Sequence, residues 1–242
     1  MITFKEVLEN QEIKKFIEAA GETLNTLGYT DHGFVHAMYT AETAGNILRE
    51  LGEDAYVVEL GLIAGYMHDI GNAVARNEHE QIGAILSYNI LTRLGMPQED
   101  LLIIMNAIGN HDEHNGTIAN KVAAAVVIAD KSDIHRGRVS KTTPPRGEEH
   151  YFVNYATTNN CLCVDKKERI ITLQLEIDDT TSPMEMLSLY SKRFLFCESA
   201  AKFLVCQFRI VINGVALNQL NTTRQTIFNA LKTSKNVSGN RL

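Results

Sequence analysis

The stretch GYMHDIGNAVARNEHE, residues 65–80, decides how the chain is interpreted. The apolar run VVELGLIAGYM, residues 57–67, overlaps the start of this stretch. His68 and Asp69 follow that run directly, side by side. The helix dipole disfavours a carboxylate at the C-terminal end of a helix, and burying an unpaired carboxylate is also costly. A bound cation would reverse both penalties. The question is therefore whether other ligand-type side chains converge on this pair.

The composition is that of an ordinary globular protein. The chain has 242 residues, 45% hydrophobic and 21% charged, which suffices for a core without disulfides. Its four cysteines are expected to be reduced. The formal net charge of −6 argues against a broad basic surface that binds the phosphate backbone of nucleic acid. A local basic pocket for a small phosphate is still compatible with this net charge. With a charged start and no long apolar run, we expect a cytoplasmic protein that binds neither nucleic acid nor membrane.

Helical periodicity extends from the N-terminus to about residue 137. Gly, Pro and Asn residues separate the helical segments, as expected for helix ends. The segment 55–72 is so apolar that it should lie at the centre of the core. The segments are 4–28, 34–52, 55–72, 80–95, 97–111 and 119–134. This pattern predicts an all-helical domain, which we bound at residues 1–145.

The composition changes after this domain. The basic, proline-containing stretch 136–150 predicts a surface connection, and 148–157 a short helix. Residues 161–178 then predict a β-hairpin, 183–205 an amphipathic helix and 207–214 a strand. The order strand, strand, helix, strand predicts a small α+β module at 158–232, with its helix packed on one sheet face. The fold class is thus mainly α, a helical bundle followed by this module, and the polar last residues should fray.

Ligand-type residues recur at the ends of the expected helices. The segments DHGFVHA, MHDIGN, NEHEQIGA, IGNHDEH and IADKSD each lie at a different helix end. A single histidine there is ordinarily a cap or a surface residue, and a lone His-Asp dipeptide carries little information. The ordered set is more specific, because helices of a bundle can bring such ends together at one depth.

This ordered set resembles the HD superfamily of metal-dependent phosphohydrolases. Members carry a His, an adjacent His-Asp and a distant Asp that bind a divalent metal on a helical bundle. The matching positions are His36, His68, Asp69 and Asp130, and the resemblance covers roughly residues 25–140. It implies hydrolysis of a phosphate ester or anhydride of a nucleotide or another small phosphorylated metabolite by metal-activated hydroxide. Two imidazoles and two carboxylates suit Mn, Fe, Co, Ni or Zn better than Mg or Ca.

The number of metal ions is left open by the sequence. Dinuclear members add a His shortly after the His-Asp pair and further ones on the next helix, which His79 and His111 match. Asp69, which we also expect to take part in catalysis, could then bridge two metals. The cyclic-dinucleotide hydrolases have two adjacent histidines where this chain has His111 and Asp112, so Asp112 or His114 could supply the last ligand. With one metal, His79 and His111 would contact substrate or water instead.

Other residues are candidates for catalysis or substrate contact. His32 precedes His36 by four positions, and YTDHGFVH looks like the paired-His segment of cyclic-nucleotide phosphodiesterases, whose earlier His protonates the leaving oxygen. A helix cap is the alternative for His32. Lys131, Arg136 and Arg138 could hold a phosphate, with solvent exposure as the alternative, and His114 is a further candidate for substrate contact. His135 and His150 are not expected near the site.

Two other functions are kept as alternatives. Some members of the superfamily are dinuclear-iron oxygenases that use O₂. A non-catalytic sensor that binds metal or nucleotide is the second alternative. The complete ligand set argues against it, because a degenerate site usually loses a ligand.

The C-terminal module carries no ligand cluster, so we interpret it as a dimerisation, lid or regulatory element. Assembly into a homo-oligomer is left open.

Overall fold

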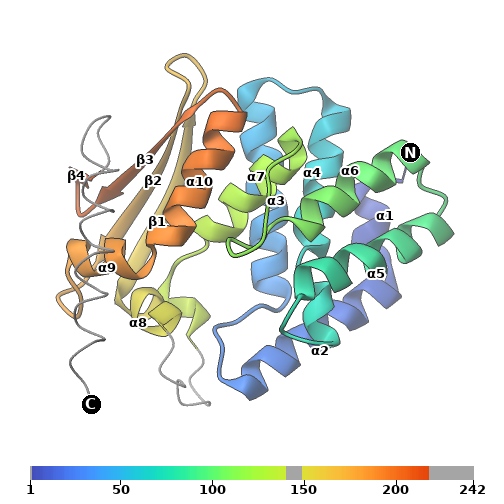
Figure 1. Ribbon diagram of the computed structural model, residues 1–242, viewed down its shortest axis with the longest axis horizontal. Helices are drawn as coiled ribbons and strands as arrows, with labels where there is room; N and C mark the ends of the chain where they lie inside the picture. Colours follow the sequence, from blue (N-terminus) through green and yellow to red (C-terminus); the bar gives the residue numbers. More distant parts are fainter. Residues whose placement is uncertain (1, 140–148, 218–242) are drawn as a thin grey trace.

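The computed structural model of the protein describes residues 2–139 and 149–217 (Figure 1). A helical bundle comes first and a small α+β module follows, which confirms the predicted fold class. The bundle consists of α1 (Phe4–Glu9), α2 (Gln11–Leu27), α3 (Phe34–Leu51), α4 (Ala55–Met67), η1 (Ile70–Ala73), α5 (His79–Arg93), α6 (Gln98–Gly109), α7 (Lys121–Ser132) and η2 (Arg136–Arg138). The module consists of α8 (Glu149–Ala156), β1 (Thr157–Asp165), β2 (Ile170–Ile177), α9 (Pro183–Leu189), α10 (Ser191–Phe203), β3 (Gln207–Ile212) and β4 (Val215–Ala216).

Two segments expected as single helices are each divided into two α-helices, and the expected helix 55–72 ends at Met67, with η1 following it. The first divides at Asn10, whose side chain caps α2 by accepting a hydrogen bond from the Ile13 amide at 3.0 Å. The second divides at Tyr190, which ends α9 and directly precedes α10. Periodicity alone does not reveal these breaks, because the apolar residues on both sides keep a helical spacing. The predicted limits 145 and 232 lie outside the described residues, so the division at 1–145 and 158–232 stays a prediction.

Helices α3 and α4 approach each other closely along small residues. A Cβ atom at Gly65 would lie 2.8 Å from both the Cα of Ala41 and the carbonyl oxygen of Thr40. Only glycine permits backbones to approach this closely. A short turn joins the two helices, so the first turn of α3 lies beside the last turn of α4. This packing brings His36 and His68, at these two ends, next to each other.

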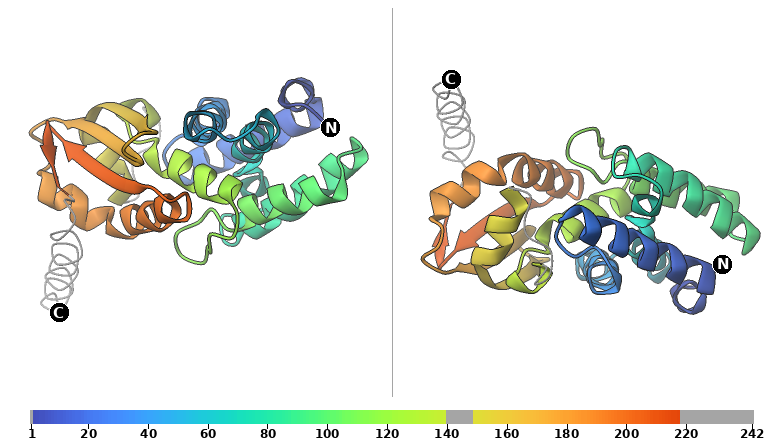
Figure 2. Two further views of the ribbon diagram at one scale, coloured as in Figure 1. Left: turned by 90° about the horizontal axis from the view of Figure 1, so that it is seen from above. Right: turned by 90° about the horizontal axis from the view of Figure 1, so that it is seen from below.

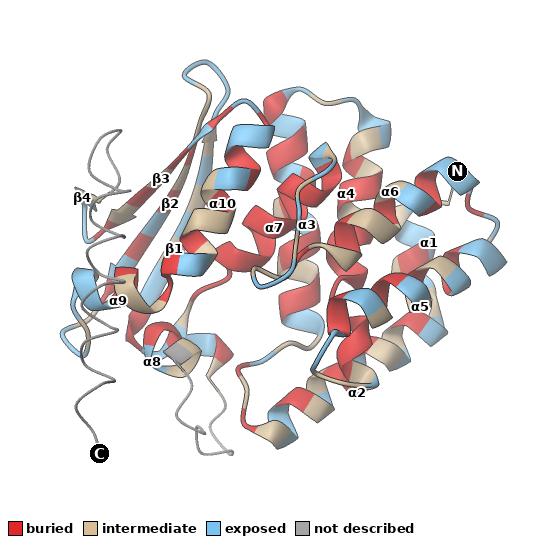
Figure 3. Cartoon of the chain, viewed as in Figure 1, coloured by how far each residue is buried: buried red, intermediate tan, exposed pale blue. Residues whose placement is uncertain are grey.

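Helix α7 is the central element of the molecule. It is buried along nearly its whole length, and α3, α4, α6 and α10 all pack against it (Figure 3). Its run of Val, Ala and Ile residues is apolar on every face, as expected for a helix with neighbours all around. Helix α7 thus joins the bundle to the module and carries Asp130 into the interior.

The module has a four-stranded sheet in the order β1-β2-β3-β4. Strands β1 and β2 form the predicted antiparallel hairpin, with Leu162 opposite Leu173, and β3 pairs with β2 in parallel. Alternate residues of β2, including Leu173 and Leu175, are buried, and α10 packs against both β3 and α7. The module therefore sits directly against the bundle (Figure 2). None of the described helices is long and apolar enough to cross a membrane.

Candidate metal centre

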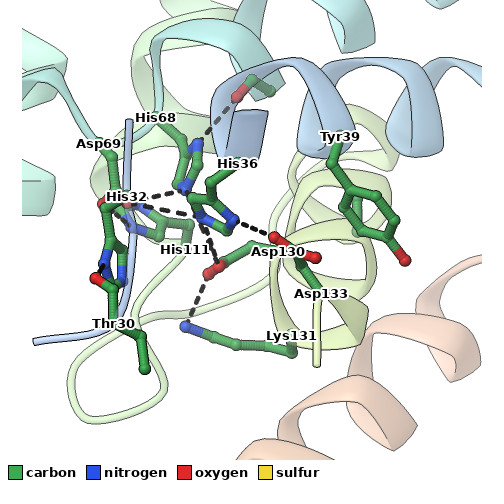
Figure 4. A network of polar contacts seen from close by, with 12 residues as sticks. Thr30, His32, His36, Tyr39, His68, Asp69, His111, Asp130, Lys131 and Asp133 are labelled. Atoms are coloured by element: carbon green, nitrogen blue, oxygen red, sulfur yellow. Dashed lines mark hydrogen bonds and ion pairs between the residues drawn. The ribbon is translucent and has the colours of Figure 1, made fainter. Parts of the chain in front are cut away.

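The structure brings three of the predicted ligands together at the junction of α3, α4 and α7. The Nε2 atom of His36 lies 3.2 Å from Nε2 of His68 and 3.4 Å from Oδ1 of Asp130. Nε2 of His68 lies 3.8 Å from the same Asp130 oxygen. All three side chains are buried, and their ligand atoms point toward one another (Figure 4). We call this group the first subsite.

Asp69 faces two groups of ligands with its two oxygens. Its Oδ2 lies 3.3 Å from Nε2 of His68 and 3.6 Å from Nε2 of His36, in the first subsite. Its Oδ1 lies 3.3 Å from Nε2 of His79 and 3.6 Å from Nε2 of His111. These last two nitrogens are 3.2 Å apart, and with Asp69 Oδ1 they form what we call the second subsite. A carboxylate in this position can bridge two cations.

The four imidazoles are all oriented through their Nδ1 atoms. Nδ1 of His68 lies 2.8 Å from the Gly65 carbonyl oxygen, and Nδ1 of His111 lies 2.7 Å from that of Ile108. The corresponding partner of His79 is the Arg76 carbonyl at 3.1 Å, and that of His36 is Oδ2 of Asp133 at 2.6 Å. An Nδ1–H that donates to these acceptors leaves Nε2 with its lone pair, the form that binds a metal.

The donor set fits a divalent transition metal. Ligand atoms bound at about 2.0–2.2 Å from one ion lie roughly 3.0–3.5 Å apart. The facing Nε2 atoms and carboxylate oxygens, at 3.2–3.8 Å from one another, are close to this spacing. Without a cation between them, the lone pairs of two Nε2 atoms at 3.2 Å would repel each other. Burial lowers the pKa of His68, but Asp69 and Asp130 more than offset this and raise it above its usual value. The site therefore favours added positive charge.

A chain of buried charges supports Asp130 from the side opposite His36. The Lys131 ammonium lies 2.8 Å from Asp130 Oδ2 and 2.6 Å from Oε2 of Glu113. Oε1 of Glu113 accepts a hydrogen bond of 3.2 Å from Nε of Arg193, which belongs to α10 of the module. Burial alone would raise the pKa of Asp130, yet the Lys131 ammonium and the two nearby imidazoles hold it well below its usual range. Asp130 is thus an anion ready to bind a cation.

A cleft of about 560 Å³ opens beside the second subsite. His79 and Glu80 line its inner end. His32 lines another part of its wall, with Nδ1 2.5 Å from the Thr30 carbonyl and its ring 5.2 Å from that of His36. Residues of the loops and of the module complete the lining: Tyr29, Thr30, Arg76, Asn77, Glu78, Asp112, His114, Asn115, His150 and Arg193.

The residues predicted to contact substrate do not all reach the cleft. Lys131 is buried and paired with Asp130 and Glu113, so its ammonium serves these carboxylates rather than a phosphate. Arg136 lies half-exposed on the module side, where its Nε donates to the Tyr155 carbonyl at 2.6 Å. Both side chains are absent from the cleft lining, whereas His114 is at its rim. There Nδ1 of His114 lies 2.9 Å from Oδ1 of Asp112.

The predicted catalytic role of His32 stays a prediction. Burial, aided by the Arg138 guanidinium, holds the pKa of His32 well below its usual value. Its ring is therefore neutral near pH 7, which favours a hydrogen-bonding role over that of a proton donor. Asp112 and His114, suggested as a last metal ligand, contact each other at the rim, and neither is among the ligand atoms gathered around Asp69.

The sequence interpretation missed several residues of the site. Asp133 orients His36. Arg138, expected from the sequence only as a phosphate contact, instead holds Asp133, with its NH1 2.8 Å from the Asp133 carbonyl. His150 was expected to lie away from the site, yet it lines the cleft. Only the segment IADKSD hinted at Asp133, because it places a second carboxylate three residues after Asp130. Nothing in the sequence pointed to His150 or Arg193.

Residues 33–134 match the sequence model of the HD domain family. The chain carries an HD domain. The match runs from the start of α3 to just past the end of α7 and contains all six residues of the two subsites. HD domains bind divalent metals, in agreement with the His and Asp clusters of this structure. The resemblance inferred from the ordered motif is thereby confirmed.

Parts of this chain are similar to other proteins. A protein of Methanocaldococcus jannaschii named only as uncharacterised is 28% identical over 160 residues, which cover 56% of this chain and 60% of that protein. Ribonuclease Y of Mycoplasma mycoides is 31% identical over 139 residues, 55% of this chain and 30% of that enzyme. A crystal structure of a predicted HD superfamily hydrolase from an uncultured Thermotogales bacterium aligns with a TM-score of 0.42 and 20% identity, covering 55% of this chain and 76% of that one.

The Asp133 carboxylate can be tested as the group that orients His36. We expect Asp133→Asn to lower affinity for the metal of the first subsite by about 10-fold or more, because a neutral amide holds the Nδ1–H less strongly. Isothermal titration of the metal-free protein with Mn²⁺ measures this change. Asp179→Asn, which alters an exposed carboxylate of the module, is the matched control. Equal affinities for the two variants would contradict the assigned role.

Proposed function

We propose that this protein is a metal-dependent phosphohydrolase with a dinuclear centre. Its substrate would be a phosphate ester or anhydride of a nucleotide or of another small phosphorylated metabolite. The observation that carries the proposal is the position of Asp69, whose Oδ2 faces His36 and His68 while Oδ1 faces His79 and His111. A site for one ion would not need this second pair of imidazoles, both buried and both presenting Nε2.

The roles of the residues follow from their positions. His36, His68 and Asp130 would hold one metal, His79 and His111 the other, and Asp69 both. Divalent metals in such a centre supply a low-pKa water as nucleophile and stabilise negative charge on phosphoryl oxygens.

The remaining groups prepare the site for this chemistry. Asp133 accepts a hydrogen bond from Nδ1 of His36 and so orients Nε2 toward the first subsite, and Lys131 engages one oxygen of Asp130 while the other faces that subsite. The cleft admits substrate from the side of the second subsite, beside His32. The neutral His32 ring can hydrogen-bond to the substrate there.

Metal content tests the dinuclear assignment. We expect about two equivalents of Mn or Fe per chain in protein purified without a metal-affinity step, and about one in His111→Ala, because that variant removes a ligand of the second subsite only. Elemental analysis measures both. Arg136→Gln, which lies outside the cleft, should keep the wild-type content. One equivalent in both the wild type and His111→Ala would refute the second subsite.

Turnover tests the hydrolase itself. The screen should contain p-nitrophenyl phosphate, bis(p-nitrophenyl) phosphate and a panel of nucleotides, with phosphate release as the readout. An O₂-uptake control is included, because oxygenase chemistry is the alternative for a dinuclear iron centre. Metal-loaded protein that consumes O₂ with an organic substrate and cleaves no phosphate ester would replace the hydrolase proposal.

The matches to ribonuclease Y favour a second candidate substrate, an RNA phosphodiester. The similarity covers 30% of that enzyme, and the chain carries a formal net charge of −6, so we place RNA after small phosphorylated metabolites. A short oligoribonucleotide in the same screen decides between them. Cleavage of the oligonucleotide with higher kcat/KM than any mononucleotide would make RNA the substrate.

A further inference from the structure

The C-terminal module contributes directly to the cleft of the HD domain. Arg193 of α10 and His150 of α8 line the cleft together with Tyr29, Arg76 and His79 of the bundle. Helix α10 packs along α7, the helix that carries Asp130 (Figure 1). Arg193 of α10 thereby reaches the cleft. The module therefore forms part of the wall of the space that reaches the second subsite.

The Arg193 side chain is held in place by two neighbours. Its Nε donates to Glu113 at 3.2 Å, and its guanidinium lies over the Tyr190 ring, 5.2 Å from the ring centroid. A guanidinium has five N–H donors, so one bond to Glu113 leaves others for a ligand in the cleft. A planar guanidinium fixed in this way can donate two parallel hydrogen bonds to a phosphate.

Arg76 is a second cation in the same cleft, beside the second subsite. Its NH1 lies 3.4 and 3.3 Å from Nδ1 and Nε2 of His79, at nearly equal distances from the two ring nitrogens. Its guanidinium also lies over the Tyr29 ring, at 5.2 Å. NH1 further donates to the Asn72 side chain at 3.3 Å. Arg76 is thus adjacent to the proposed metal centre without being one of its ligands.

The other polar groups of the cleft leave these two cations available. Burial lowers the pKa of His150 to about 3, so its ring is neutral at pH 7. The carboxylates of Glu80 and Asp112 are engaged by Nδ1 of His79, at 3.2 Å, and by Nδ1 of His114, at 2.9 Å. Glu78 also lines the cleft, and its residue is exposed to solvent. Arg76 and Arg193 therefore offer an anion two guanidinium groups in one space.

We propose that Arg193 and Arg76 bind a second anionic group of the substrate, a phosphate other than the one held at the metal centre. The substrate class is then a compound with two phosphate groups, such as a nucleoside diphosphate. This inference rests on the proposed function and assigns the module a part in substrate binding, whereas the sequence suggested a dimerisation, lid or regulatory role. A substrate with a single phosphate would leave Arg193 without its partner.

The test measures binding before turnover. Stopped-flow fluorescence anisotropy follows the initial binding of the N-methylanthraniloyl derivatives of ADP and AMP to the full chain loaded with Mn²⁺. We expect the wild type to bind the diphosphate about 10-fold or more tightly than the monophosphate. Arg193→Gln should remove this preference and leave affinity for the monophosphate within about 2-fold. Arg193→Lys should retain part of the preference, because lysine keeps the positive charge but cannot donate two parallel hydrogen bonds.

The controls separate binding from a structural role of Arg193. Arg136→Gln, outside the cleft, should behave as the wild type. The manganese content of each variant is measured, and Arg76→Gln provides a second test of the anion site if Arg193→Gln does not fold. Equal wild-type binding of both nucleotides, or an equal loss of both in Arg193→Gln, overturns the inference. A protein that shows the preference but hydrolyses no phosphate ester would instead refute the proposed function.

Discussion

Asp69→Ala is expected to abolish turnover and to leave the protein with almost no bound metal. The substitution removes one oxygen from each subsite, because Oδ2 faces His68 and Oδ1 faces His79. The nucleophile and the stabilisation of phosphoryl charge both depend on the metal, so we expect kcat to fall by about 10³-fold or more. Elemental analysis and phosphate release measure the two losses on the same preparation.

Asp69→Asn refines this test. The asparagine side chain keeps one oxygen and replaces the other by an amide nitrogen, which does not bind metal. We expect a protein with about one equivalent of metal, because only one subsite retains its shared ligand. Circular dichroism confirms that both variants are folded, and Asp179→Asn on the exposed module surface is the control. Full activity of Asp69→Ala would end the proposal of a metal-dependent hydrolase.

Elements that depend on local pattern could be predicted from the sequence. The helical spacing of the bundle, the hairpin at 161–178 and the strand beginning at residue 207 were all found. The predicted metal ligands were chosen by their order along the chain and their places at expected helix ends, and the structure brings all six together. Their proximity results from close packing such as that of Gly65 against Ala41.

Contacts between distant segments could not be predicted in the same way. Lys131 follows a metal ligand, but the sequence did not show that its ammonium turns inward to Asp130 and Glu113. Arg193 and His150 reach the cleft because α8 and α10 dock against the bundle, and no local pattern encodes that docking. For the same reason the sequence suggested only a dimerisation, lid or regulatory element for the module.

Gly71→Ala is expected to damage the second subsite and to destabilise the fold. A Cβ atom at Gly71 would lie 1.9 Å from the His79 carbonyl oxygen and 2.6 Å from the Gly83 amide nitrogen, both backbone atoms of α5. Helix α5 or the η1 turn must then move, and the distance of 3.3 Å from Asp69 Oδ1 to His79 Nε2 depends on their contact. Overpacking of this kind costs about 1–3 kcal/mol or more in free energy of unfolding.

Two measurements separate these effects. Thermal unfolding should show a Tm lower by about 2–12 °C for a chain of this length. Metal analysis should show about one equivalent, because the first subsite does not include His79. Gly109→Ala is the matched control, since its added Cβ would meet only the Ala84 Cβ at 3.4 Å, an ordinary contact. A Gly71→Ala protein with wild-type Tm and two metals would show that α5 is not held in place by this glycine and that His79 reaches Asp69 by another constraint.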